Sequence, residues 1–318
     1  MTKEGELGMS WSLYLPVAGN SINILLLFGL GGAVGFLSGV FGVGGGFLMT
    51  PLLIMAGIPS TVAAASDSNQ IVAASTSGAY AHYRLGNVDF KMGIFLLIGG
   101  VIGGTLGVQL IKVLRSMGNA DFVIKITYVV MLGVIGGYMF MESLQALRKK
   151  PALEARRPEP AKVSRYNRFI QSLPYQMRFD KSGVILSPLL PLILGILVGI
   201  LAAIMGVGGG FIMVPVMVYM LRMPMHVVVG TSLFQILFTC INVTIMQAIT
   251  NFTVDLVLAI ILLLGSTVGA QFGVRLSRRL KADQLKILLA SIVLIVMVQM
   301  LASLIIPPHL MLTHKGGH

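Results

Sequence analysis

The sequence contains few charged residues. Asp, Glu, Lys and Arg make up only 11% of its 318 residues, whereas a soluble domain carries about 25%. Apolar residues make up 56%, and the mean hydropathy is +0.90. Runs of about 20 apolar residues, each long enough to cross a bilayer as a helix, recur along the chain. These values exclude an ordinary soluble domain and predict an all-α polytopic membrane protein, placed as a multi-pass protein in the cell inner membrane.

Cysteine and acidic residues are also scarce. The single cysteine, Cys240, excludes a disulfide framework and a CxxC metal or redox motif, so neither a cofactor nor a metal ion is predicted. Eleven acidic residues against 23 Lys and Arg give a net charge of +12. Because the positive charge lies in loops between apolar segments, the positive-inside rule explains it without a nucleic-acid partner. The lipid bilayer is the predicted environment, and the oligomeric state stays open.

The apolar segments fall into two halves joined by a basic linker. Residues 148–181 contain ten Lys or Arg against three acids, together with four prolines, so no compact domain is expected there. The predicted order is an N-terminal interfacial segment (1–21), a transmembrane repeat (22–147), a basic cytoplasmic linker (148–183), a second transmembrane repeat (184–306) and a C-terminal tail (307–318).

A repeated glycine run identifies the halves as copies of one unit. The run GVGGGF occurs at 42–47 and again at 206–211, and each copy is followed four residues later by a proline. Further matches continue along both halves. They are Pro59 with Pro224, Gln70 with Gln235, Val88-Asp89 with Val254-Asp255, and Gly99, Gly103 and Gly107 with Gly265, Gly269 and Gly273.

Loop charge predicts that the two repeats are inverted relative to each other. The basic linker and the loops at 84–91 and 275–281 are assigned to the cytoplasm, which leaves the loops at 112–125 and 250–253 outside. This works if each repeat begins with a helical hairpin interrupted at the glycines and continues with three membrane helices. Inverted repeats with broken helices at midplane are the architecture of many secondary transporters.

The glycine runs have two interpretations. As site residues, they end a helix at membrane depth, where free backbone N–H groups are tolerated only around a protein-enclosed cavity, and helix N-termini there favour an anion. As packing residues, they only permit tight turns and close helix crossing. The packing interpretation is preferred for Gly99, Gly103 and Gly107, and the site interpretation for the two runs.

Polar residues at matched positions complete the predicted site. Ser66 with Thr231 and Gln70 with Gln235 lie near the starts of membrane helices, where polar groups face the protein interior. Asp67 is open to three interpretations: a helix cap, a proton carrier, or a repulsive selectivity element. The predicted substrate-binding residues are Gly44, Gly45, Gly46, Phe47, Ser66, Asp67, Gln70, Gly208, Gly209, Gly210, Phe211, Thr231, Ser232 and Gln235.

Other polar residues have simpler explanations. Arg84 and Asp89 are expected to pair across a tight loop. Ser38 before Gly39 lacks a histidine partner in any apolar helix, and paired membrane aspartates are absent, so the protein is not expected to be an enzyme.

The duplicated GVGGGF-x₃-P blocks, the Pro-x₆-Ser/Thr helix starts, the loop AHYRLGNVDFKMG and the run Gly230-Thr231-Ser232-Leu233 resemble the TauE/SafE family of sulfite exporter-like membrane permeases. The resemblance covers residues 25–305 and implies export of sulfite, an organosulfonate or a related small anion. One departure is that Ala65-Ser66-Asp67-Ser68 stands where the second half has Gly-Thr-Ser-Leu.

The sequence therefore predicts a secondary transporter that moves a small anion, sulfite or an organosulfonate, outward by alternating access. Coupling to membrane potential, to protons or to the anion gradient stays open. The alternatives are a transporter or channel for a different small anion, such as a carboxylate.

Overall fold

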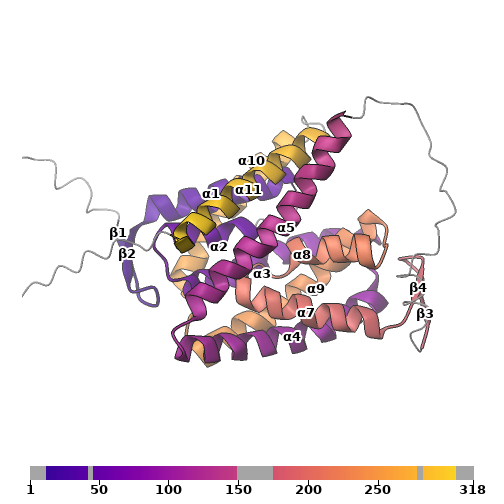
Figure 1. Ribbon diagram of the computed structural model, residues 1–318, viewed down its shortest axis with the longest axis horizontal. Coiled ribbons are helices and arrows are strands. Elements are labelled where there is room, and N and C mark those ends of the chain that lie inside the picture. The colour runs from indigo at the N-terminus through magenta and orange to yellow at the C-terminus, as the bar shows by residue number, and fades with distance from the viewer. Residues whose placement is uncertain (1–11, 42–45, 149–174, 278–281, 306–318) are drawn as a thin grey trace, which may run out of the picture.

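The computed structural model of the protein describes residues 12–41, 46–148, 175–277 and 282–305. These residues form two halves with the same order of elements (Figure 1). The first half contains β1 (Ser12–Leu15), β2 (Asn20–Asn23), α1 (Ile24–Phe41), α2 (Gly46–Met55), α3 (Ser60–Arg84), α4 (Phe90–Ser116) and α5 (Ala120–Arg148). The second contains β3 (Met177–Phe179), β4 (Val184–Leu186), α7 (Leu189–Met205), α8 (Gly210–Pro215), the π-helical turn η1 (Val216–Met220), α9 (Met225–Met246), a second π-helical turn η2 (Gln247–Asn251), α10 (Leu256–Ser277) and α11 (Ala282–Ile305).

Helices dominate, as predicted, and within the described residues four of them are long and apolar enough to cross a membrane. These are Phe90–Ser116, Ala120–Met141, Met225–Asn251 and Leu256–Gly273. Shorter apolar helices flank the two glycine runs. The predicted tail at 307–318 lies outside the described residues.

Two β-hairpins correct the all-α expectation. β1 pairs with β2, and β3 pairs with β4, both antiparallel. Each hairpin directly precedes the first helix of its half, and the two lie at opposite ends of the molecule (Figure 1). The second occupies the end of the basic linker, where no compact structure was expected. The sequence signal was hidden because strands of three or four residues are too short to show a periodic pattern.

The halves exchange their most extensive helix contacts. α1 packs along α10, and α7 packs along α4, so each half supplies one helix to each pair. A Cβ added at Gly35 would overlap with the backbone of Ser266, and one added at Gly103 would overlap with the backbone of Ile196. Close backbone approach of this kind requires small residues. The packing interpretation of Gly99, Gly103 and Gly107 is therefore confirmed.

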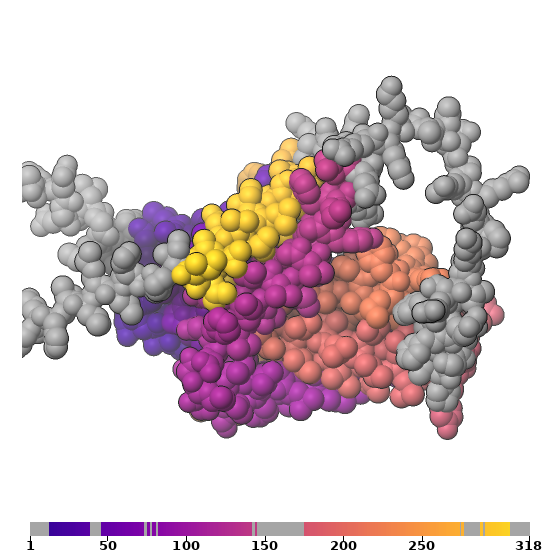
Figure 2. Space-filling view, in the orientation of Figure 1, coloured from indigo at the N-terminus to yellow at the C-terminus, as the bar shows by residue number. Residues whose placement is uncertain are grey.

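Equivalent helices meet in antiparallel pairs. Gly78 of α3 faces Leu233 of α9, whereas Ile71, earlier on α3, packs with Cys240, later on α9. α5 and α11 form a second such pair, in which Gly133 faces Met297 and Gly136 faces Val293. These two helices lie together across one face in Figure 2.

Buried aspartates fasten the two ends of the molecule in the same way. Asp89 caps α4 by accepting from the Met92 N–H at 3.1 Å, and its other oxygen accepts from the N–H and hydroxyl of Ser182 in the β3–β4 turn. Asp255 caps α10 and accepts from the Val17 N–H in the β1–β2 turn at 3.2 Å. The expected pairing of Arg84 with Asp89 is wrong, because the hairpin turn occupies the carboxylate instead.

The hairpin at the linker end is also held by charge at the surface. Lys91 on α4 donates to Asp180 at 2.9 Å, and both side chains are exposed. The hydrogen bond and positive charge of Lys91 lower the pKa of Asp180. Lys181 donates to the Gly86 carbonyl at 3.1 Å. These contacts place the loop at 84–91 beside the end of the linker, and the cytoplasmic location of both segments stays a prediction.

Helix α3 occupies the centre of the protein. It contacts α2, α5, α7, α9 and α10, and the nine residues from Ser60 to Ser68 are all buried. Its polar sequence therefore faces other helices rather than lipid. In a bilayer, polar side chains are stable only when they are enclosed in this way.

Candidate functional site

The second glycine run is a break between two helices. α7 ends at Met205, and α8 begins at Gly210. Between them Gly206, Gly208 and Gly209 have positive φ angles of 76°, 67° and 80°, a conformation that side chains with a Cβ rarely adopt. In the first half, α1 ends at Phe41 before the first glycine run, and α2 begins at Gly46 within it. Residues 42–45 of this run, including the predicted Gly44 and Gly45, lie outside the described residues.

The two breaks meet in the core. The rings of Phe47 and Phe211, the last residues of the two runs, stack with centroids 4.4 Å apart and planes at 14°. A Cβ added at Gly46 would lie 3.5 Å from the Val207 carbonyl oxygen. Phe47 and Phe211 are buried to 2% and 3% exposure. The structure thus brings Gly46 beside Val207 and Phe47 against Phe211, which lie 161 and 164 residues further along the chain.

Two isoleucines close the space around the breaks. Ile71 of α3 and Ile236 of α9 directly follow the matched glutamines, and they form a buried apolar cluster with Cys240. A Cβ at Gly208 would contact all three of these side chains, and one at Gly46 would overlap with Ile71. The centre is therefore closed by apolar side chains in this conformation.

Ser66 and Thr231 have equivalent partners in opposite halves. The Thr231 hydroxyl accepts from the Asp89 N–H at 3.0 Å, and the Ser66 hydroxyl accepts from the Asp255 N–H at 3.4 Å. Ser232 bonds back to the Val229 carbonyl of its own helix. The hydroxyls of Ser66 and Thr231 thus join α3 and α9 to the opposite half, at the aspartates that cap α10 and α4.

Gln70 and Gln235 are buried, and in each side chain the amide nitrogen has a hydrogen-bond partner while the amide oxygen has none among the described residues. The Gln70 Nε2 donates to Ser266 at 2.7 Å, and the Gln235 Nε2 donates to Thr239 at 2.8 Å. Among the described residues, neither Oε1 has a hydrogen-bond partner. Because an unpaired buried polar atom is costly, a matched pair of them indicates positions that a polar ligand or water can satisfy.

Asp67 lies fully buried on the second turn of α3, seven residues after the helix begins. The cap interpretation is therefore wrong. Its Oδ2 accepts from the Thr50 hydroxyl of α2 at 2.8 Å, while its Oδ1 has no partner among the described residues. Tyr128 of α5 lies beside Thr50 and donates its hydroxyl proton to the carbonyl of Met205, directly before the second glycine run.

Three residues near Asp67 and the second glycine run were not among the site residues predicted from the sequence. Thr50 and Tyr128 surround Asp67, and Ser68 donates to the Gly206 carbonyl at 3.2 Å. Thr50 could have been found because it is the one polar side chain between the first glycine run and Pro51. Tyr128 resembled an ordinary membrane-helix tyrosine, and nothing local marked it.

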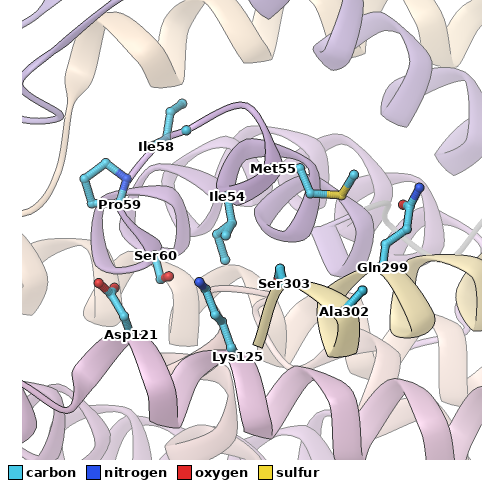
Figure 3. A pocket seen from close by; sticks show the side chains of 11 residues that line it. Ile54, Met55, Ile58, Pro59, Ser60, Asp121, Lys125, Gln299, Ala302 and Ser303 are labelled. Carbon is cyan, nitrogen blue, oxygen red and sulfur yellow. The ribbon is translucent and has the colours of Figure 1, made fainter. Parts of the chain in front are cut away.

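A groove opens near this cluster (Figure 3), and β2 lies beside it, because the Asn20 side chain donates to the carbonyl of the lining residue Gly57 at 2.8 Å. It lies between the end of α2, the starts of α3 and α5, and the end of α11, with a volume of about 670 Å³. Its polar lining comes from Ser60, Asp121, Lys125, Gln299 and Ser303. In Figure 3 the Lys125 side chain points from α5 into the groove.

Across the described ranges, no group of three or more His, Cys, Asp or Glu side chains could hold a metal ion.

A model of the family described as sulfite exporter TauE/SafE matches residues 27–300. The chain is 26% identical over 276 residues to the probable membrane transporter protein YjnA of Bacillus subtilis, covering 86% of this chain and 97% of that protein. It is 29% identical over 268 residues to the probable membrane transporter protein YdhB of the same organism, covering 83% and 92%.

A shorter match joins the chain to a plant protein. It is 31% identical over 91 residues to the sulfite exporter TauE/SafE family protein 5 of Arabidopsis thaliana, covering 28% of this chain and 20% of that protein. No solved structure matches the chain.

Proposed function

The chain belongs to the sulfite exporter TauE/SafE family, and from this premise we propose that it is a secondary transporter that moves a small anion, sulfite or an organosulfonate, out across the cytoplasmic membrane. Its relatives are named as probable membrane transporters, which supports a multi-pass membrane protein that carries a small molecule rather than an enzyme. In this proposal the protein lies in the inner membrane with its basic loops facing the cytoplasm.

The two halves act as inverted repeats in this proposal. The antiparallel pairing of α3 with α9 and of α5 with α11 supports inversion, because equivalent helices must then run in opposite directions. The hairpins that begin each half also lie at opposite ends of the molecule. The order of segments given above, with the linker in the cytoplasm, belongs to the same proposal.

One observation carries the site assignment: the two helix breaks, one from each half, meet at the Phe47–Phe211 stack. An anion would bind there between the glycine runs, with the side chains of Gln70 and Gln235 nearby. Because Ile71 and Ile236 close this space, the structure corresponds to an occluded state. Movement of the halves against each other would expose the site to one side at a time.

Reconstituted protein tests the substrate. Labelled sulfite, an organosulfonate such as isethionate, and a carboxylate such as acetate are offered to proteoliposomes preloaded with the same unlabelled anion. We expect saturable uptake of sulfite or isethionate by exchange. Saturable uptake of the carboxylate without uptake of either sulfur anion would show that the substrate is a carboxylate. Channel-like conductance in a planar bilayer would show that the protein is a channel and does not work by alternating access.

Replacing Phe211 with alanine tests the site. Because this side chain forms half of the central stack, we expect F211A to reduce the rate of anion exchange at least tenfold while the protein remains folded by size-exclusion chromatography. Phe238→Ala is the matched control, since Phe238 lies on the neighbouring helix α9 with 41% of its surface exposed. Equal rates of anion exchange in the two variants would show that the Phe47–Phe211 stack is not part of the binding site.

A further inference from the structure

Three of the aspartates whose burial the structure describes are buried, and one of them differs from the other two. Asp89 and Asp255 each begin a helix, and each carboxylate accepts at least two hydrogen bonds that include backbone N–H groups. Asp67 lies inside α3, and Thr50 is the only described residue that donates a hydrogen bond to it. One of its oxygens is left without a partner.

Among the described residues, no cation forms an ion pair with Asp67. The described ion pairs involve only Lys91, Arg178 and Asp180, at the surface. Among the helices packed around α3, the titratable groups that sense the charge of Asp67 are Tyr128 on α5 and Cys240 on α9, both neutral when protonated. Helices α2 and α7 contain no titratable residue, and α10 contains only the exposed Arg275.

An ionised carboxylate in such a place is unstable without a partner, and a protonated one is not. The protonated form also matches the hydrogen-bond inventory. Protonation of Oδ1 removes the charge while Oδ2 continues to accept from Thr50, and the Oδ1 hydroxyl can donate to a water or ligand that reaches it. The second half has no equivalent acid, because Ser232 stands at the matched position. The closed centre therefore has one site for one proton.

Three residues that line the groove of Figure 3 lie about one to two helical turns along their helices from Thr50, Asp67 or Tyr128. Ile54 follows Thr50 by four residues on α2, and Ser60 precedes Asp67 by seven on α3. Lys125 precedes Tyr128 by three on α5. A helical turn rises about 5.4 Å, so Ile54, Ser60 and Lys125 lie roughly 5–10 Å along their helices from Thr50, Asp67 and Tyr128.

We propose that Asp67 is the proton-coupling residue of the transporter and that this groove is the route by which its proton enters or leaves. Resting on the proposed function, the assignment makes the transporter a cotransporter of an anion and a proton. In this proposal the Asp67 carboxylate takes up a proton that enters through the groove, and the Asp67 carboxyl group releases it to water when the site faces the other side.

The physical reason is electrostatic. An ionised Asp67 repels an anion from the nearby glycine runs, and this repulsion is strong where no water screens it. Protonation removes the repulsion, so anion and proton occupy the protein together. A high internal anion concentration still drives export, because the direction follows the combined gradients of both ions.

Asp67→Asn tests the proposal, because asparagine keeps the shape and an acceptor for Thr50 but cannot carry the proton. Wild-type protein and D67N are reconstituted, with the membrane potential clamped, and supplied with whichever labelled anion wild type transports. One proton per monovalent anion is electroneutral, so a gradient of one pH unit should accumulate isethionate about tenfold in wild type. We expect D67N to lose this accumulation and to retain exchange of labelled for unlabelled anion.

Asp180→Asn, which removes an exposed carboxylate, is the control and should behave as wild type. Gradient-driven accumulation retained in D67N would overturn the proposal, as would the loss of exchange together with accumulation in folded D67N.

An infrared spectrum of the purified proteins gives a readout independent of flux. The band of a protonated carboxyl group at neutral pH should be present in wild type and absent in D67N, and an unchanged band would overturn the assignment. If wild type carries none of the anions but the band disappears in D67N, then the proposed function fails while the protonated Asp67 stands.

Cysteine labelling tests the groove. Ser303→Cys places a thiol in the lining of the groove, and Ser116→Cys places one outside it on α4. The two serines are matched, because each bonds back to a carbonyl of its own helix, at 2.8 and 2.7 Å. A bulky thiol reagent should slow proton-driven uptake at least fivefold in S303C and leave S116C unchanged. Equal inhibition, or none in S303C after complete labelling, would exclude this route.

Discussion

Replacing Gly206 with alanine should destabilise the protein more than any surface substitution. Its positive φ of 76° costs a residue with a Cβ about 1–2 kcal/mol. The added Cβ would also overlap with the backbone of Ala64 on α3, and overpacking costs about 1–3 kcal/mol. We expect a large fall in the apparent Tm in detergent and in the monodisperse fraction recovered by size-exclusion chromatography.

Gly183→Ala separates the two causes. Gly183 has a φ of 67° in the β3–β4 turn, and a Cβ there would meet nothing within 4 Å. Its alanine variant therefore carries only the backbone strain and should lose about 1–2 kcal/mol. If the two variants melt at the same temperature, then the close approach of Gly206 to α3 does not constrain the helix break.

Replacing Asp89 with alanine should have the second large effect. The variant leaves the N–H groups of Met92 and Ser182 unpaired and buried, and it releases the β3–β4 turn from the start of α4. A lost helix cap and an unpaired buried donor together cost about 2–4 kcal/mol. The fall in Tm should be larger than in Asp89→Asn, which retains one accepting oxygen.

The opposite half supplies a comparison for this prediction. Asp255→Ala should lower the Tm by a similar amount, because Asp255 caps α10 and binds the β1–β2 turn in the same manner. Asp180→Ala, at an exposed carboxylate of the same hairpin that Asp89 holds, should give no resolvable change. Two unequal aspartate variants would show that the two ends are not held equivalently.

Most of the helices could be read from the chain because a membrane helix is a local feature. Twenty apolar residues, or a glycine run that interrupts them, need no distant partner to be recognised. The duplication was equally accessible, since matched residues recur at fixed spacing. The β-hairpins escaped because strands of three or four residues carry little pattern and owe their stability to the aspartates of loops far along the chain.

The candidate site shows the same division. The sequence proposed that Ser66 and Thr231 contact a substrate, which stays a prediction, and in the structure each hydroxyl accepts a hydrogen bond from a loop amide of the opposite half. Equivalent polar residues fit a substrate site and an interface between repeats equally well, and no local signal separates the two. Only their partners could decide.

The sequence by itself determined that the protein lies in a membrane, that a glycine run and the residues around it recur in both halves, and that glycines break the helix pair of the second half. These properties follow from hydropathy and repetition, which are linear. Only the tertiary structure decided that the two breaks meet at Phe47 and Phe211 and that Asp67 lies inside a helix beside Thr50 and Tyr128. The physical reason is that these contacts join segments 17 to 164 residues apart in the chain. Their proximity depends on the packing of α1 against α10 and of α7 against α4, which brings the two halves together.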